Sequence, residues 1–151
     1  PALVGLGMTG LMARAGVSDK DRTLVERVIR TTGDLVWVGT EADLDAVTAI
    51  SGSGPAYVFY FLEAMRDAGA RMGLPPDVAY RLAVGTFVGA STLAQRSDEP
   101  PQTLRERVTS KGGTTYAALT SMETAGVKAK FEEALFAAQK RAEELGREFG
   151  G

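Results

Sequence analysis

An uninterrupted apolar segment, residues 56–62, limits the folds open to this chain more than any other feature. It reads Ala-Tyr-Val-Phe-Tyr-Phe-Leu and follows Pro55, which suits the first turn of a helix that we expect to run to about Met72 and to stop at Gly73. With 3.6 residues to a turn, such a run covers every side of the helix. The helix must therefore be buried all round, either by its own domain or by a second subunit. The run is far too short to cross a bilayer.

The composition excludes several kinds of chemistry. Of the 151 residues, 44% are apolar and 24% are charged, which is typical of a soluble globular protein. The net charge of −2 gives no electrostatic reason to expect nucleic acid or an anionic membrane as a partner. Because the chain has no His and no Cys, it contains no Ser-His or Cys-His nucleophilic site and no disulfide, and we expect no metal site. A chain without cysteine is compatible with the cytoplasm, where we expect it.

Residues 1–40 follow the pattern strand, helix, strand. We predict short strands at residues 3–14 and 35–38, with a helix between them that begins at Ser18 and stops at Gly33. The apolar residues of this helix recur at helical spacing: Leu24, Val25, Val28 and Ile29. This order is typical of the last unit of an α/β domain. Because the chain starts at Pro1 directly in a strand-like run, Ala2–Val4, we expect an amino-terminal portion to precede it.

After Glu41 the pattern is helical throughout, which predicts a mainly α fold. A first helix is expected to end at Ser51–Gly54, and the apolar helix described above follows it. The later helices are predicted from Pro76 to about Arg96, from Pro100 to near Thr109, over residues 115–125 and over residues 127–148. For the helix that begins at Pro76, the predicted inner face consists of Leu82, Ala83, Phe87 and Leu93.

Residues Gly5–Gly10 match the pattern G-x-G-x-x-G of dinucleotide-binding loops. That loop needs a strand before it, a helix after it and an acidic residue about 20 positions further on. Residues 11–16 are too few for the crossover helix, and Glu41 comes late. We therefore favour a glycine-rich strand that a neighbouring segment packs closely against.

A second small-residue segment consists of Ser51, Gly52, Ser53 and Gly54. It is either a turn between two helices or a place where the backbone approaches a ligand and free N–H groups at a helix start face it. Composition by itself favours the turn.

The strongest local signal is the segment Ser110, Lys111, Gly112, Gly113, Thr114 and Thr115. Successive N–H groups in a Gly-Gly turn before a helix form an anion cradle, and the helix dipole favours negative charge there. Its hydroxyls can donate to a carboxylate or accept from an amine or iminium N–H. The alternative is an ordinary helix start capped by Thr114 or Thr115, and the two interpretations carry equal weight.

Taken in order, these segments resemble the pyrroline-5-carboxylate reductase family. The likeness covers essentially the whole chain, and its last stretch is the most diagnostic. The matching stretches are Pro1–Gly5 with Gly7–Thr9, Asp45–Tyr57, Gly69–Pro75, and Leu104-Arg105 leading to Val108–Thr115.

This resemblance implies a 6-phosphogluconate dehydrogenase C-terminal-like fold. Residues 41–151 would form an all-helical, substrate-binding dimerisation domain that interleaves with a second subunit, and residues 1–40 would be the carboxy-terminal remnant of an NAD(P)-binding Rossmann domain. The implied reaction is the reduction of 1-pyrroline-5-carboxylate to L-proline, the last step of proline biosynthesis, by hydride transfer from NADPH or NADH. The main cofactor site would lie upstream of Pro1, and the partner would be a second copy, in a homodimer alone or in a larger oligomer.

The resemblance also assigns roles to the two candidate segments. Residues 110–115 would hold the substrate carboxylate, with Thr115 as the catalytic hydroxyl near the ring nitrogen. Residues 51–54 would lie near the nicotinamide. Lys111 stands where the family usually has proline, which loosens the loop and adds a positive charge. Two alternatives remain: a non-catalytic helical dimerisation module when the chain is isolated from its cofactor domain, and an independent dinucleotide-binding protein that uses Gly5–Gly10.

Overall fold

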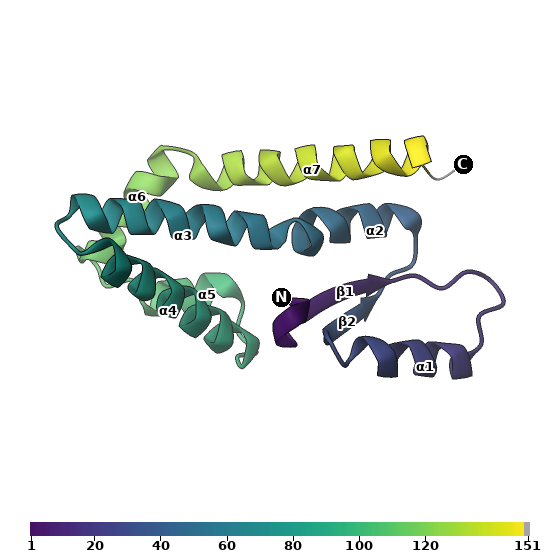
Figure 1. The fold of residues 1–151 in the computed structure, drawn as a ribbon. Coiled ribbons are helices and arrows are strands. Elements are labelled where there is room, and N and C mark those ends of the chain that lie inside the picture. The colour runs from purple at the N-terminus through teal and green to yellow at the C-terminus, as the bar shows by residue number, and fades with distance from the viewer. Residues whose placement is uncertain (150–151) are drawn as a thin grey trace. The chain divides into compact units, whose positions relative to one another are not determined.

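The computed structural model describes residues 1–149, and helices predominate among them (Figure 1). The chain divides into two compact units. The first, here the strand unit, contains Pro1–Tyr57 and the chain from Phe131 onward. The second, here the helical unit, contains Val58–Lys130.

The strand unit contains a two-stranded parallel sheet. Strand β1 (Gly7–Leu11) pairs with β2 (Gly33–Trp37), and helix α1 (Asp19–Ile29) connects them. In Figure 1, α1 lies on one side of the two strands and α2 (Glu41–Val47) on the other. The predicted strand–helix–strand order is therefore confirmed.

The first predicted strand is too long at both ends. Ala2–Val4 forms a 3-10 turn (η1), not a strand, because the N–H groups of Val4 and Gly5 donate back to the carbonyls of Pro1 and Ala2, both at 3.0 Å. Backbone groups used in such a local turn are not free to extend a sheet ladder.

Helices α1 and α2 begin with the same device, a reciprocal capping box. Ser18 accepts from the backbone N–H of Asp21 while the Asp21 carboxylate accepts from Ser18, and Thr40 and Asp43 repeat the arrangement. The hydrogen bonds from Ser18 lower the pKa of Asp21, and those from Thr40 lower the pKa of Asp43. The predicted start of α1 at Ser18 is thus confirmed.

The predicted end of α1 at Gly33 is wrong. The helix ends at Ile29, and the hydroxyls of Thr31 and Thr32 donate to the carbonyls of Val28 and Ile29 at 2.7 and 2.9 Å. These threonines satisfy the last carbonyls of the helix, so Gly33 is left to begin β2.

Trp37 joins α1 to the end of β2. Its indole Nε1–H donates to the Glu26 carboxylate at 2.6 Å. The Arg22 guanidinium lies 5.0 Å from the centre of the same ring, in cation–π range.

The predicted helical series after Glu41 is confirmed, with bounds that shift by a few residues. Proline stands at or next to the first position of α4 and α5, where its missing N–H costs nothing. The helices that follow α2 are α3 (Gly54–Arg71), α4 (Pro76–Gln95), α5 (Pro101–Arg107), α6 (Thr114–Thr124) and α7 (Val127–Phe149).

The chain buries few apolar side chains by itself. Among residues 1–149 the buried apolar set is Ala49, Leu62, Ala79 and Ala83. In the apolar run that opens α3, Phe59 is 59% exposed and Tyr60 is 69% exposed. The chain therefore does not surround this helix.

The predicted inner face of α4 is only half correct. Ala83 is buried and Phe87 is half-buried, but Leu82 and Leu93 are exposed. Helix α4 thus has apolar side chains on two sides. The spacing of apolar residues in the sequence did not show which of these sides packs against the rest of the chain.

Gly10 confirms the interpretation of Gly5–Gly10 as a closely packed strand. A Cβ at Gly10 would lie 2.7 Å from a methyl carbon of Val47 in α2. The motif lies within and before β1, and no helix begins directly after it. Close packing of the strand against α2 explains this glycine.

We predict that Gly10→Ala destabilises the chain by about 1–3 kcal/mol, because Val47 is stiff in a helix and cannot yield without strain. The free energy of unfolding, from urea denaturation followed by circular dichroism, measures this. Gly146→Ala is the control, because a Cβ there meets nothing within 4 Å. Equal stability of the two variants would contradict the packing argument.

Candidate functional site

Residues 110–115 form a tight turn that leads into α6, within the helical unit. The N–H of Gly113 donates to the carbonyl of Ser110 at 3.0 Å, and Gly112 has a φ of 72°. A hydrogen bond across four residues with positive φ at the third is the signature of a type II turn. Lys111 occupies the second position, which favours proline because proline fixes the negative φ required there.

The start of α6 presents free N–H groups. Gly113 occupies the cap position and no side chain caps the helix, so the alternative of a Thr114 or Thr115 cap is wrong. Within residues 1–149 the N–H groups of Thr114, Thr115 and Tyr116 donate to no partner, whereas the N–H of Ala117 already donates to the Gly113 carbonyl. These N–H groups point out of the helix end where the dipole is positive.

The side chains around this turn are also available. No hydrogen bond joins the hydroxyls of Ser110, Thr114 or Thr115 to any residue of the described chain. Thr115 is half-buried, while Ser110, Lys111 and Thr114 are exposed. The Ser110 hydroxyl lies against Gly113, where a Cβ would collide with it.

Residues 51–54 do not form the turn between two helices that their composition favours. Thr48–Gly52 is a π-helical turn (η2) that continues directly from α2, and α3 begins at Gly54. The N–H of Ser53 donates to the Thr48 carbonyl at 2.8 Å, five residues back. Such π turns occur disproportionately at functional sites.

Within this segment the serines differ. The Ser51 hydroxyl donates to the Val47 carbonyl at 3.2 Å and is occupied by its own helix. The Ser53 hydroxyl has no partner in the part of the chain that the structure describes. This segment belongs to the strand unit, whereas residues 110–115 belong to the helical unit, so each is a separate candidate.

One contact at the π turn was missed by sequence reasoning. The Tyr57 hydroxyl donates to the carbonyl of Ala49 at 3.1 Å, and its ring packs edge-on against Phe131 of α7 with centroids 5.7 Å apart. From the sequence, Tyr57 belongs to the apolar run and to the stretch Asp45–Tyr57 that resembles the family, and neither feature predicts this contact. A tyrosine in such a run, with its polar end in need of a partner, was the available signal.

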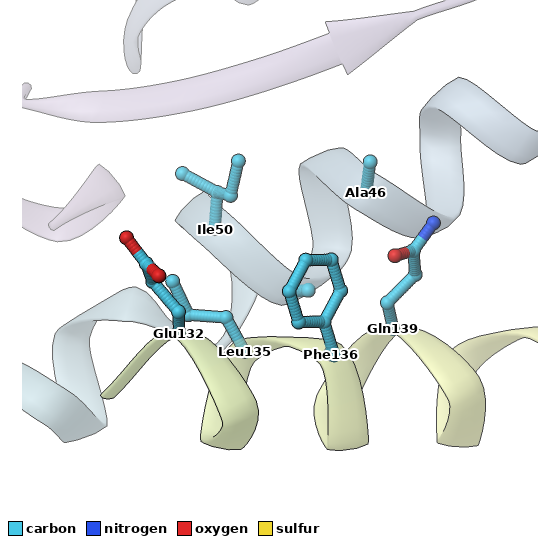
Figure 2. A pocket seen from close by; sticks show the side chains of 7 residues that line it. Ala46, Ile50, Glu132, Leu135, Phe136 and Gln139 are labelled. Carbon is cyan, nitrogen blue, oxygen red and sulfur yellow. The ribbon is translucent and has the colours of Figure 1, made fainter. Parts of the chain in front are cut away.

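An apolar hollow of about 240 Å³ lies between α2 with η2 and α7, also within the strand unit. Figure 2 shows the ring of Phe136 rising from α7 toward the helix that carries Ala46 and Ile50, with Glu132 and Gln139 to either side of it on α7. Ile50 is 66% exposed and Phe136 is 67% exposed. None of the predicted site residues lines this hollow, so it is an apolar surface separate from both candidate segments.

No helix in the described chain is both long and apolar enough to cross a membrane. No three acidic side chains of residues 1–149 come together as a candidate metal site.

A known protein family matches most of the chain. The family model described as "Pyrroline-5-carboxylate reductase dimerisation" matches residues 41–145. The chain belongs to this family. The predicted fold class, a helical dimerisation domain preceded by a strand–helix–strand segment, is therefore confirmed.

Relatives match over nearly the whole chain. The pyrroline-5-carboxylate reductase of Pseudomonas aeruginosa is 44% identical over 150 residues, covering 99% of this chain and 55% of that protein. The reductase of Corynebacterium melassecola is 42% identical, covering 97% of this chain and 54% of that protein. The chain thus spans about half the length of these curated relatives.

Solved structures agree with this assignment. The pyrroline-5-carboxylate reductase of Coxiella burnetii superposes with a TM-score of 0.90 at 38% identity, covering 94% of this chain and 53% of that chain. The Plasmodium falciparum pyrroline carboxylate reductase, solved with NADP bound, superposes with a TM-score of 0.87 at 33% identity, covering 97% and 59% of the two chains.

The turn geometry predicts opposite effects at neighbouring positions. We expect Lys111→Pro to stabilise the chain by about 0.4–1 kcal/mol, because Lys111 has negative φ and its N–H makes no hydrogen bond within residues 1–149. We expect Gly112→Ala to cost about 1–2 kcal/mol, because φ is positive there. Urea denaturation of both variants measures this, and a destabilised Lys111→Pro would contradict the turn type.

Proposed function

We propose that this chain is the substrate-binding and dimer-forming part of an enzyme that reduces 1-pyrroline-5-carboxylate to L-proline with NADPH or NADH. One observation carries the proposal: the turn at residues 110–115 joins unpaired N–H groups, three free hydroxyls and a helix start in a chain of this family. The curated relatives named pyrroline-5-carboxylate reductase support the reaction.

The turn suits the carboxylate of the substrate. N–H groups at the start of α6 donate to carboxylate oxygens, and the helix dipole stabilises the negative charge. The hydroxyls of Ser110 and Thr114 add donors. Lys111 adds a positive charge beside the same turn and makes no ion pair within the described residues.

Thr115 is the residue that we assign to the reacting end of the substrate. Its hydroxyl accepts from the N–H of the ring iminium, which holds the C=N bond in place as the positive charge on it disappears. An iminium carbon is already electrophilic, so the protein mainly needs to position it. A site without His is therefore sufficient.

Residues 51–54 fit a cofactor-contacting segment. Gly52 is exposed, a Cβ at Gly54 would meet nothing within 4 Å, and the Ser53 hydroxyl lacks a partner among the described residues. Small residues of this kind let a ligand reach the backbone closely. The bound reduced nicotinamide would supply the hydride, and the NADP-bound relative from Plasmodium falciparum supports this choice of cofactor.

We propose further that residues 1–40 are the last strand–helix–strand unit of the nucleotide-binding domain and that residues 41–151 are the helical substrate-binding and dimerisation domain. The parallel pairing of β1 with β2 across α1 supports the first assignment, because such crossovers build nucleotide-binding sheets. The complete enzyme would then unite both parts.

A second copy of the chain is the partner that we propose. The exposed aromatic side chains of α3 lie in the segment that matches the dimerisation family. Large apolar surfaces of this kind mark protein–protein contacts. Without its nucleotide-binding domain, the isolated chain would dimerise but not catalyse the reaction.

Thr115→Ala in the complete enzyme is expected to lower kcat about a hundredfold, because the C=N bond is then no longer held in the orientation that hydride transfer needs, while the protein stays dimeric. Steady-state kinetics and analytical ultracentrifugation measure the two properties. Thr120→Ala is the control, because the Thr120 hydroxyl is bound to the Tyr116 carbonyl of its own helix at 2.9 Å. Unchanged turnover in Thr115→Ala would remove Thr115 from the mechanism.

Phe59→Asp is expected to convert a dimeric chain into monomers at micromolar concentration, because a charge would enter an apolar contact. Sedimentation velocity measures the mass. Val28→Asp, at a side chain that is also 59% exposed but lies outside the family match, should stay dimeric. A monomeric unmutated chain would refute the proposed partner.

A further inference from the structure

The backbone of the π turn leaves one carbonyl in need of a donor. In an α-helix the N–H of Ser53 would donate to the carbonyl of Ala49, four residues back. Here it donates to Thr48, five residues back. Ala49 is only 2% exposed, so water does not readily replace the lost donor. An unpaired buried carbonyl is costly, and the Tyr57 hydroxyl supplies the missing bond at 3.1 Å.

The position of Tyr57 follows from its own packing. It lies in the first turns of α3, just after the π turn, and is half-buried. The edge-on contact with the Phe131 ring holds the tyrosine ring in place. All the groups in this arrangement belong to the strand unit.

We propose that Tyr57 is a positioning residue. It holds residues 51–54 in the π-helical hydrogen-bond register, in which these residues contact the nicotinamide nucleotide. This inference rests on the proposed function of that segment. The Tyr57 hydroxyl stabilises the π turn relative to an ordinary α-helical turn, because only the π turn leaves the Ala49 carbonyl open to it.

The alternative register would change what the segment presents. A π turn contains one residue more than the α-helical turn that it replaces, and each helical residue rotates by about 100°. Relaxation to the α register would therefore turn Ser53 and Gly54 away from their present direction. Loss of one hydroxyl at Tyr57 would then weaken nucleotide binding without any contact between Tyr57 and the nucleotide.

The test compares Tyr57→Phe with Tyr80→Phe in the complete enzyme. Both substitutions remove one hydroxyl, but the Tyr80 hydroxyl makes no hydrogen bond within residues 1–149. We expect Tyr57→Phe to raise the KM for NADPH or NADH about 5-fold, the effect of one hydrogen bond, with the KM for 1-pyrroline-5-carboxylate unchanged. Tyr80→Phe should leave both constants unchanged.

A third variant, Gly52→Val, separates this inference from the proposed function. If Gly52→Val raises the nucleotide KM and Tyr57→Phe does not, the positioning role is refuted while the cofactor assignment stands. If neither variant changes the nucleotide KM, the cofactor assignment of residues 51–54 is wrong, and the inference falls with it. Two other outcomes would show a merely structural role for Tyr57 and overturn the inference. In one, the Tyr57→Phe protein is insoluble; in the other, its kcat and its melting temperature are lower while both KM values are unchanged.

Discussion

Large apolar side chains of the helices face away from the chain's own core. The stability of the fold therefore depends on a surface that covers them. The buried apolar set among residues 1–149 consists mostly of alanines, whose burial removes little apolar area from water. Phe59 on α3 and Phe136 on α7 remain largely exposed. Because apolar burial is the main stabilising contribution to folding, such a chain needs contacts that it does not supply itself. Its membership in a dimerisation family agrees with this requirement.

The two candidate segments share a physical principle, since each exposes backbone polar groups that helices normally pair. At residues 110–115 a Gly-Gly turn delivers the chain to α6 without a side-chain cap, which leaves N–H groups free. At residues 51–54 the π turn shifts the hydrogen-bond register, and Pro55 has no N–H to offer the Ser51 carbonyl. Unpaired N–H groups at a helix start, as at α6, are sites where anions bind.

The sequence interpretations failed where two local rules competed. Thr114 and Thr115 are good capping residues, yet Gly113 takes the cap position because the turn closes on its N–H. Residues 51–54 have a turn composition, yet the helices on both sides and the Tyr57 hydroxyl carry the chain through as a π turn. In each case a hydrogen bond made by a neighbouring residue decided the local structure, against the conformation that the composition of the segment favours.

The sequence by itself determined the order and type of the elements, the helix starts at Ser18 and at the prolines of α4 and α5, and the family resemblance. These features depend on residues close together in the chain, so local patterns predict them. Only the tertiary structure decided that Gly10 packs against Val47, that Tyr57 reaches Ala49, and which face of α4 meets its own chain. The reason is physical: hydrophobic periodicity shows that a face is apolar, but it does not identify the surface that covers it.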